Sequence, residues 1–161
     1  ALASFDGSAA ELEAAVQRNP ANQRARLLLA SIYSRGKDRP RAEQHLRAAL
    51  EREPANPLLH LRLGVLLREE GKRRDALKEF RFIEQKRPHH LSMLFQTGLT
   101  HRADGNCHLA SAYMKRFFLY AKRVDKPNIN RLKPKAQEVL DACGAGRPQP
   151  KGKRNRPEQA K

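Results

Sequence analysis

Apolar residues recur along the chain at the three- and four-residue spacing of a helix face. Residues spaced in this way lie on one side of an α-helix, so each group predicts an amphipathic helix and not a strand. Glycines that we expect to end these helices follow the groups. The groups are Leu29, Ile32 and Tyr33, then Leu63, Leu66 and Leu67, and the glycines are Gly36, Gly71 and Gly105.

Prolines reveal a longer repeat, because Pro20, Pro54 and Pro88 are 34 residues apart. Several other residue classes keep the same step, which indicates a repeated unit of two helices. These classes are Ala42, Ala76 and Ala110, then Leu46, Phe80 and Met114, and Gly64 and Gly98 with Ala30 one step earlier.

Polar residues mark where the helices of each unit begin. Asn22 and Asn56 suit the N-terminal cap of first helices, and Asp38 and Asn106 suit the cap of second helices. Each unit is therefore expected to be a helix, a turn and a helix.

A unit of 34 residues with a small residue in its first helix, an alanine in its second and a proline near its end resembles the tetratricopeptide repeat (TPR) family. The resemblance implies an all-α fold, a right-handed superhelical α-solenoid of antiparallel helix pairs. The full units are residues 21–54, 55–88 and 89–122, of which the third is the most divergent. The arginine- and alanine-rich composition resembles that of bacterial TPR proteins.

Shorter segments flank the three units. Residues 1–20 read as a partial repeat helix, with Ser8 and Glu11 as a capping box before it, and an array that opens on half a unit is compatible with a longer array. Residues 123–143 predict one capping helix that starts at Asn128 or Asn130 and covers the last apolar face. Residues 144–161 are rich in proline, glycine and charge and are expected to be disordered.

In the TPR family the first helices line a concave surface that usually holds the ligand. Leu27, Leu61 and Phe95 share one repeated slot there, and an exposed apolar row is costly unless a ligand, the last helix or the N-terminal half-repeat covers it. The groove lacks the paired Asn and Lys that grip a C-terminal carboxylate, which argues against recognition of chaperone tails. The resemblance implies a peptide-binding groove of Arg24, Leu27, Ser31, Arg35, Leu58, Leu61, Val65, Arg68, Phe95, Leu99 and Arg102. Ser34 and Glu69 also fall on this lining.

The chain is strongly basic, with 33 Lys+Arg against 17 Asp+Glu and a formal net charge of +16. Such a field attracts acidic proteins, nucleic acids and anionic membranes. Phe117, Phe118 and Tyr120 are expected to pack in the core and not to stack on bases. The predicted basic patch is Lys115, Arg116, Lys122, Arg123, Lys126, Arg131, Lys133 and Lys135.

No metal, cofactor or catalytic site is expected. His101, Cys107 and His108 are neighbours in sequence but fit no standard metal-binding spacing, and His101 occupies the slot of an apolar residue in the other units. The chain has neither a glycine-rich phosphate loop nor a nucleophile elbow. We therefore predict a non-enzymatic protein.

Cys107 and Cys143 leave the redox state open, since two cysteines do not define a disulfide scaffold. No apolar stretch approaches the roughly 20 residues that span a bilayer, so a soluble chain is expected. Its compartment is either cytoplasmic or exported to the periplasm, and Ala1-Leu2-Ala3 has the small-x-small look of a signal cleavage site.

These observations favour an adaptor or assembly factor whose groove binds a polypeptide with apolar anchors and acidic residues. A secretion-type chaperone is an alternative, because class II type III chaperones resemble this chain in having three TPR units and a final helix. Those chaperones are commonly acidic, and the charge of +16 argues against that reading. A scaffold that contacts nucleic acid or anionic lipid through the basic C-terminal third is the third hypothesis.

Overall fold

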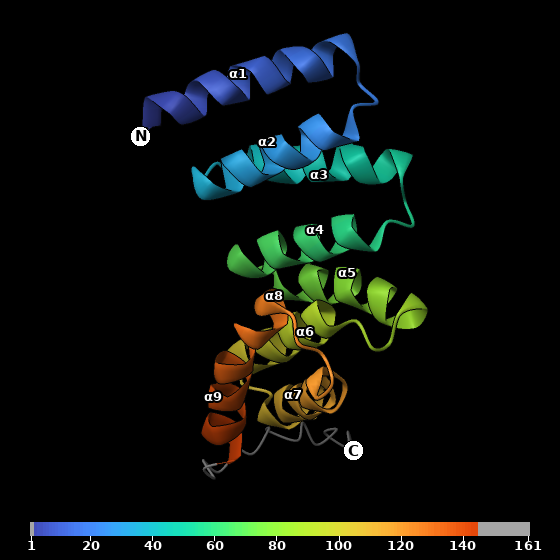
Figure 1. The fold of residues 1–161 in the computed structure, drawn as a ribbon, viewed down its shortest axis with the longest axis vertical. Helices are drawn as coiled ribbons and strands as arrows, with labels where there is room; N and C mark the ends of the chain where they lie inside the picture. The colour runs from blue at the N-terminus through green and yellow to red at the C-terminus, as the bar shows by residue number, and fades with distance from the viewer. Residues whose placement is uncertain (1, 145–161) are drawn as a thin grey trace, which may run out of the picture.

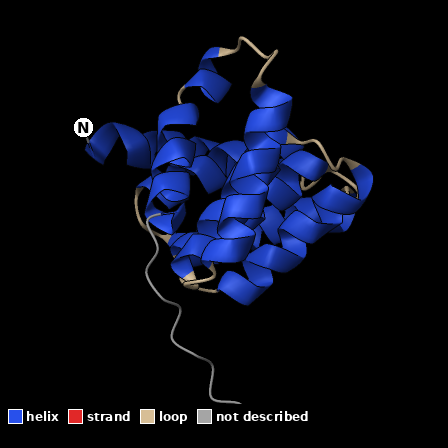
Figure 2. Ribbon diagram, turned by 90° about the horizontal axis from the view of Figure 1, so that it is seen from below, coloured by secondary structure: helices blue, strands red, loops and turns tan. Residues whose placement is uncertain are grey.

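The fold is a stack of α-helices, shown in Figure 1 as a computed structural model that describes residues 2–144 and the side chains of residues 8–144. The predicted disordered tail, from residue 145 onward, lies outside the described residues. Figure 2 shows helices joined by loops throughout the described part of the chain, which confirms the all-α prediction. The helices are α1 (Leu2–Arg18), α2 (Gln23–Arg35), α3 (Arg39–Arg52), α4 (Pro57–Glu69), α5 (Arg73–Lys86), α6 (Leu91–Ala103), α7 (Cys107–Ala121), α8 (Pro127–Asn130) and α9 (Lys133–Gly144).

Consecutive helices pair, and the pairs pile up along one axis. Helices α2 and α3, α4 and α5, and α6 and α7 pack most closely on each other, and α3 and α5 also pack on the first helix of the next pair. The helix α1 packs on α2 as the second helix of a preceding pair would. Each layer thus buries its apolar faces against the neighbouring layers, as repeat arrays do.

The predicted caps form. The side-chain oxygen of Asn22 accepts a hydrogen bond from the Ala25 amide at 3.0 Å, and that of Asp38 accepts one from the Arg41 amide at 3.3 Å. Asn56 and Asn106 cap α4 and α7 in the same way. These bonds satisfy amides that have no partner within the helix, so they fix where each helix begins.

Two predictions about the ends of the array are wrong. Helix α1 already begins at Leu2, so Ser8 and Glu11 lie inside it and do not form a capping box before it. The C-terminal segment forms two helices, α8 and α9, where we predicted one. Pro134 explains the break, because its ring would clash with the Asn130 carbonyl four residues earlier in a continuous helix.

Residues in the left-handed region mark the turn inside each pair. They are Lys37 with φ 64°, Gly71 with φ 79° and Gly105 with φ 75°, spaced by the 34-residue repeat. Gly36 has φ −72°, so Lys37, and not Gly36, corresponds to the glycines of the other two units. The left-handed conformation is part of the repeat even where the residue is a lysine.

The helices of a pair approach most closely at the small residue of the first helix. A Cβ built on Gly64 would lie 2.4 Å from Cε1 of Phe80, and one built on Gly98 would lie 2.7 Å from Cε of Met114. The first unit has Ala30 at this position and Leu46 at the position of Phe80. A larger first-helix residue thus accompanies a smaller partner.

A disulfide joins Cys107, the first residue of α7, to Cys143 near the end of α9, with the two Cα atoms 5.1 Å apart. Helix α9 packs against α7 and, over a smaller area, against α6. The disulfide therefore fastens the last helix of the described chain to the third repeat. The sequence had left the state of both cysteines open.

Candidate functional site: a pocket between the first helices

A pocket of about 430 Å³ opens between α2 and α4. Four of its lining residues come from α2, one from α3 and six from α4. They are Ala30, Ser31, Ser34 and Arg35, then Leu46, then Leu58, Leu61, Arg62, Val65, Leu66 and Glu69. The pocket therefore spans the first helices of units one and two.

Apolar side chains form the base and one wall of the pocket. Leu46 and Leu66 are buried in the main core, and Leu61 and Val65 are half-buried beside it. Leu58 is 45% exposed at one end, which is unusual for a side chain of this size. The three- and four-residue spacing along α4 places Leu58, Leu61 and Val65 on one helix face.

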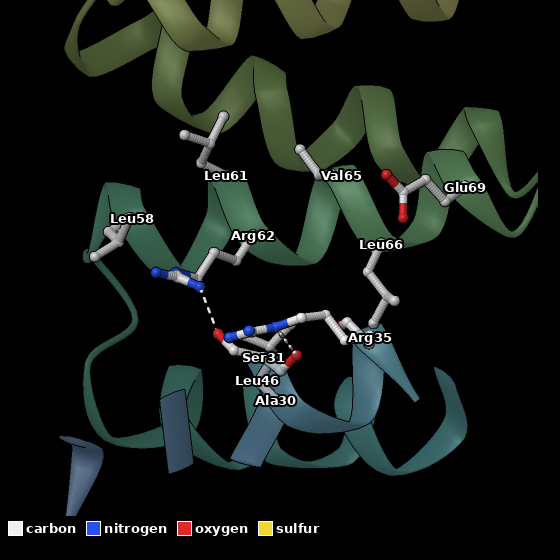
Figure 3. A pocket seen from close by; sticks show the side chains of 11 residues that line it. Ala30, Ser31, Arg35, Leu46, Leu58, Leu61, Arg62, Val65, Leu66 and Glu69 are labelled. Atoms are coloured by element: carbon white, nitrogen blue, oxygen red, sulfur yellow. Dashed lines mark hydrogen bonds between the residues drawn. The ribbon is translucent and has the colours of Figure 1, made fainter. Parts of the chain in front are cut away.

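Two arginines, Arg35 of α2 and Arg62 of α4, converge at Ser31. The Arg62 Nη1 donates a hydrogen bond to the Ser31 hydroxyl at 2.9 Å, and the Arg35 Nε donates to the Ser31 carbonyl at 3.4 Å (Figure 3). Both arginine side chains are exposed. The pocket thus presents two guanidinium groups together with aliphatic side chains, an arrangement suited to a carboxylate next to an apolar group.

Of the predicted groove residues, the structure brings Ser31, Arg35, Leu58, Leu61 and Val65 together in the pocket, and Ser34 and Glu69, also predicted on the lining, join them. Their role in binding stays a prediction. The others of units one and two lie outside the lining: Arg24 is exposed, Leu27 is half-buried, and Arg68 is half-buried with its Nη2 3.3 Å from Glu69 Oε1.

The third unit contributes nothing to this pocket. Phe95, predicted as an exposed contact, is only 3% exposed, and its ring centroid lies 5.8 Å from that of Phe117. Leu99 is half-buried against the same core, and Arg102 is exposed. Because α9 packs on α6 and α7, the chain itself covers this part of the repeat array. The assignment of Phe95 to the groove is therefore wrong.

Sequence reasoning missed Arg62, although it lies four residues after Leu58 and three before Val65. That spacing was the available signal, since it places all three on adjoining positions of one helix face. The slot is occupied by Leu28 and Gln96 in the other units, so no repeated residue type drew attention to it. Ala30, Leu46 and Leu66 read as ordinary core positions and are core positions that also reach the pocket.

Most of the predicted basic patch is exposed, but Lys133 and Arg116 are half-buried. Lys133 bonds Asn130, and Arg116 belongs to an internal network. Arg116 forms an ion pair with Glu84, which also accepts a hydrogen bond from Tyr113. Burial and this bond raise the pKa of Tyr113. Arg116 therefore holds α5 and α7 together and is not a free cation of the patch.

The histidine and cysteine residues near the third turn are structural. The His101 ring stacks on that of Tyr113 with centroids 5.6 Å apart, and burial lowers the pKa of His101. Cys107 is held in the disulfide. Among residues 2–144, no group of three or more His, Cys, Asp or Glu side chains is arranged to hold a metal ion. Nor does any helix of that segment have the length and apolar character to cross a membrane.

Comparison with known proteins bears on the fold. A tetratricopeptide repeat family model matches residues 1–57 and 33–72. No curated protein sequence matches the chain. The structure of MamA from MSR-1 superposes with a TM-score of 0.66 at 22% identity, over 74% of this chain and 69% of that one.

Two further solved structures are of proteins with a peptide-binding site or a bound partner. YrrB, a TPR protein with an unusual peptide-binding site, has a TM-score of 0.71 and 17% identity, over 84% of this chain and 66% of YrrB. The TPR2B domain of yeast Sti1, in complex with pHsp70, has a TM-score of 0.69 and 13% identity, over 78% of this chain and 98% of the domain. At these identities the likeness concerns the fold.

Proposed function

We propose that this chain, which a tetratricopeptide repeat family model matches over residues 1–57 and 33–72, is a non-enzymatic adaptor or assembly factor that binds a partner polypeptide between α2 and α4. The pocket that joins the exposed Leu58 and the half-buried Leu61 and Val65 to two arginines carries the proposal. Likeness in fold to YrrB and to the Sti1 domain supports it, since YrrB has a peptide-binding site and the Sti1 domain forms a complex with pHsp70.

The lining indicates the chemistry of the bound segment. An aliphatic side chain of the partner packs on Leu58, Leu61 and Val65, and a carboxylate one or two residues away accepts hydrogen bonds from Arg62 or Arg35. Burying the exposed part of Leu58 removes apolar surface from water, and a guanidinium to carboxylate bond adds direction. The pocket volume of about 430 Å³ accommodates a short segment of chain and not a folded domain.

We also propose that the protein works in an oxidising compartment, as the exported reading predicts. The Cys107–Cys143 disulfide supports this, because structural disulfides persist outside the reducing cytosol. Protein isolated from its own cells with free thiols blocked at lysis should carry no alkylated cysteine. Two alkylated cysteines in the folded protein would contradict the assignment.

A peptide library tests the groove. Seven-residue peptides with one aliphatic and one acidic position are screened against the full chain, and the best binders are measured against Leu58→Glu and Arg62→Glu. Each substitution should weaken binding at least tenfold, because the first places a charge on the apolar wall and the second reverses a selecting charge. Leu119→Gln, on the outer side of α7, is the matched control and should bind like the parent. Equal peptide affinity of the parent and all variants would contradict the proposal.

A further inference from the structure

The outer side of α7 carries the most exposed leucine of the described chain. Leu119 is 67% exposed, against 46% for Leu28 and 45% for Leu58. Leu58 lies in the pocket, whereas Leu119 lies on α7, the second helix of the third unit. Figure 1 shows α7 at the other end of the stack from α1. A large apolar side chain held this far in solvent lacks a packing role within the described chain.

Cations surround Leu119 on the same side of the helix. Lys115 precedes it by four residues, and Lys122 and Arg123 follow it by three and four. Lys122 keeps helical geometry after the end of α7, and Arg123 lies in the same turn. All three are exposed, and none forms an ion pair or side-chain hydrogen bond within residues 2–144. Helix α7 contains no Asp or Glu at all. We call Lys115, Leu119, Lys122 and Arg123 the outer face of α7.

The other second helices lack this combination. The slot of Lys115 holds Arg47 in α3 and Arg81 in α5, so an exposed cation is present in every unit. The slot of Leu119 holds Glu51 and Gln85 instead. Only the third unit replaces a polar residue by an exposed leucine beside its cations, so the repeat pattern alone does not account for it.

We propose that the outer face of α7 docks on an anionic lipid bilayer, with Lys115, Lys122 and Arg123 against the headgroup phosphates and Leu119 inserted among the acyl chains. Amphipathic helices bind bilayers through this pairing of basic and apolar side chains. The exposed Lys126, Arg131 and Lys135 after α7 add to the positive field. The pocket between α2 and α4 involves other helices and stays free for its own ligand.

A nucleic acid would use the same cations but would gain nothing from Leu119. Binding to single strands draws on exposed aromatic side chains, whereas Phe117 is buried and Phe118 and Tyr120 are half-buried. The Cys107–Cys143 disulfide at the start of α7 also indicates an oxidising compartment, where nucleic acid is scarce and membrane surfaces are not. Both observations favour lipid.

Co-sedimentation with vesicles tests the proposal on the full chain. Vesicles of phosphatidylcholine with 30% phosphatidylglycerol should bind the protein at low salt, and pure phosphatidylcholine vesicles should not. Neutralising the face by Lys115→Gln, Lys122→Gln and Arg123→Gln should weaken binding about a hundredfold, at about fivefold for each cation near an anionic surface. Leu119→Gln should weaken it about tenfold by removing the inserted side chain. Leu28→Gln, at the next most exposed of these leucines and on α2, is the control and should not change binding.

Three results would overturn the proposal once far-UV circular dichroism shows that the variants are folded. Unchanged vesicle binding by Leu119→Gln would show that Leu119 does not insert into the bilayer. Displacement from vesicles by a 30-base-pair DNA duplex at a lower concentration than by anionic lipid would identify nucleic acid as the ligand. Loss of all vesicle binding in the triple variant Lys151→Gln, Lys153→Gln and Arg154→Gln would show that the C-terminal tail, and not the outer face of α7, contacts the lipid.

Discussion

Lys37 keeps the left-handed backbone conformation of the repeat at a position where the other two units have glycine. It adopts φ 64°, the conformation of Gly71 and Gly105 at the same repeat position. Left-handed backbone costs a residue with a Cβ about 1 kcal/mol, and glycine avoids that cost. Lys37→Gly should therefore raise the free energy of unfolding by about 0.5–1 kcal/mol, measured by urea denaturation.

The neighbouring glycine provides the control for this prediction. Gly36 is right-handed at φ −72°, and a Cβ there would come no closer than 3.5 Å to another atom. Gly36→Ala should be neutral or stabilising, whereas Gly71→Ala should destabilise by about 1 kcal/mol. A destabilised Lys37→Gly protein would mean that the lysine side chain stabilises the turn by more than its backbone costs.

Predictions for single residues succeeded where the determining contact is close in sequence. They failed where that contact is distant in sequence. The caps at Asn22, Asp38 and Asn106 each depend on an amide three residues away, so the sequence contains all that they need. Phe95 occupies the slot of Leu61, and its position in the repeat predicted exposure. The structure buries Phe95 in a core that includes Phe117 of α7 and Ala136 and Val139 of α9, and a repeat pattern carries no information on that.

The close approach within each helix pair is a property of two elements together. In the second unit, Gly64 leaves room for the Phe80 ring, and Gly64→Ala would place a methyl group 2.4 Å from Phe80 Cε1. We expect Gly64→Ala to lower the free energy of unfolding by about 1–3 kcal/mol, the usual cost of overpacking. Gly98→Ala should cost less, because the atom in its way is the flexible tip of Met114.

The first unit supplies the compensating change for a double-mutant cycle. It combines Ala30 with Leu46, so Gly64→Ala together with Phe80→Leu recreates that pair in the second unit. The double variant should be more stable than the sum of the two single changes predicts, by about 1 kcal/mol or more in urea denaturation. Strict additivity would show that the two positions do not constrain each other.

The 34-residue period predicted the positions of the paired helices. It did not predict that the C-terminal segment breaks into two helices. The 34-residue step predicted the paired helices, because each unit has to bury its apolar face against the next. The single C-terminal helix was wrong, although Pro134 and its clash with the Asn130 carbonyl were readable in the sequence. That prediction rested on the apolar spacing of Leu132, Ala136, Val139 and Leu140 and did not take Pro134 into account.

At the scale of the whole molecule, the pocket shows what a repeat pattern predicts about a surface. The repeat predicted that first helices line it, and seven predicted residues do meet there, Ser31, Ser34, Arg35, Leu58, Leu61, Val65 and Glu69. It did not predict where the lining stops. That limit comes from α9, whose placement depends on contacts between segments far apart in sequence and on the link from Cys107 to Cys143.

The disulfide leads to a prediction about how stability is distributed along the stack. It closes a loop with a sequence separation of 36 residues, and a cross-link of that span stabilises by about 3–4 kcal/mol in the chain-entropy treatment. Repeat arrays are held by contacts between neighbouring layers, so the effect of Cys107→Ser with Cys143→Ser should remain local. Amide hydrogen exchange should speed up most in α9 and the start of α7, while α2 to α5 keep their protection. Peptide binding in the pocket between α2 and α4 should then survive reduction. An equal loss of protection in all helices would contradict this, because it would mean that the stack unfolds as one unit and that the C-terminal link stabilises the pocket as well.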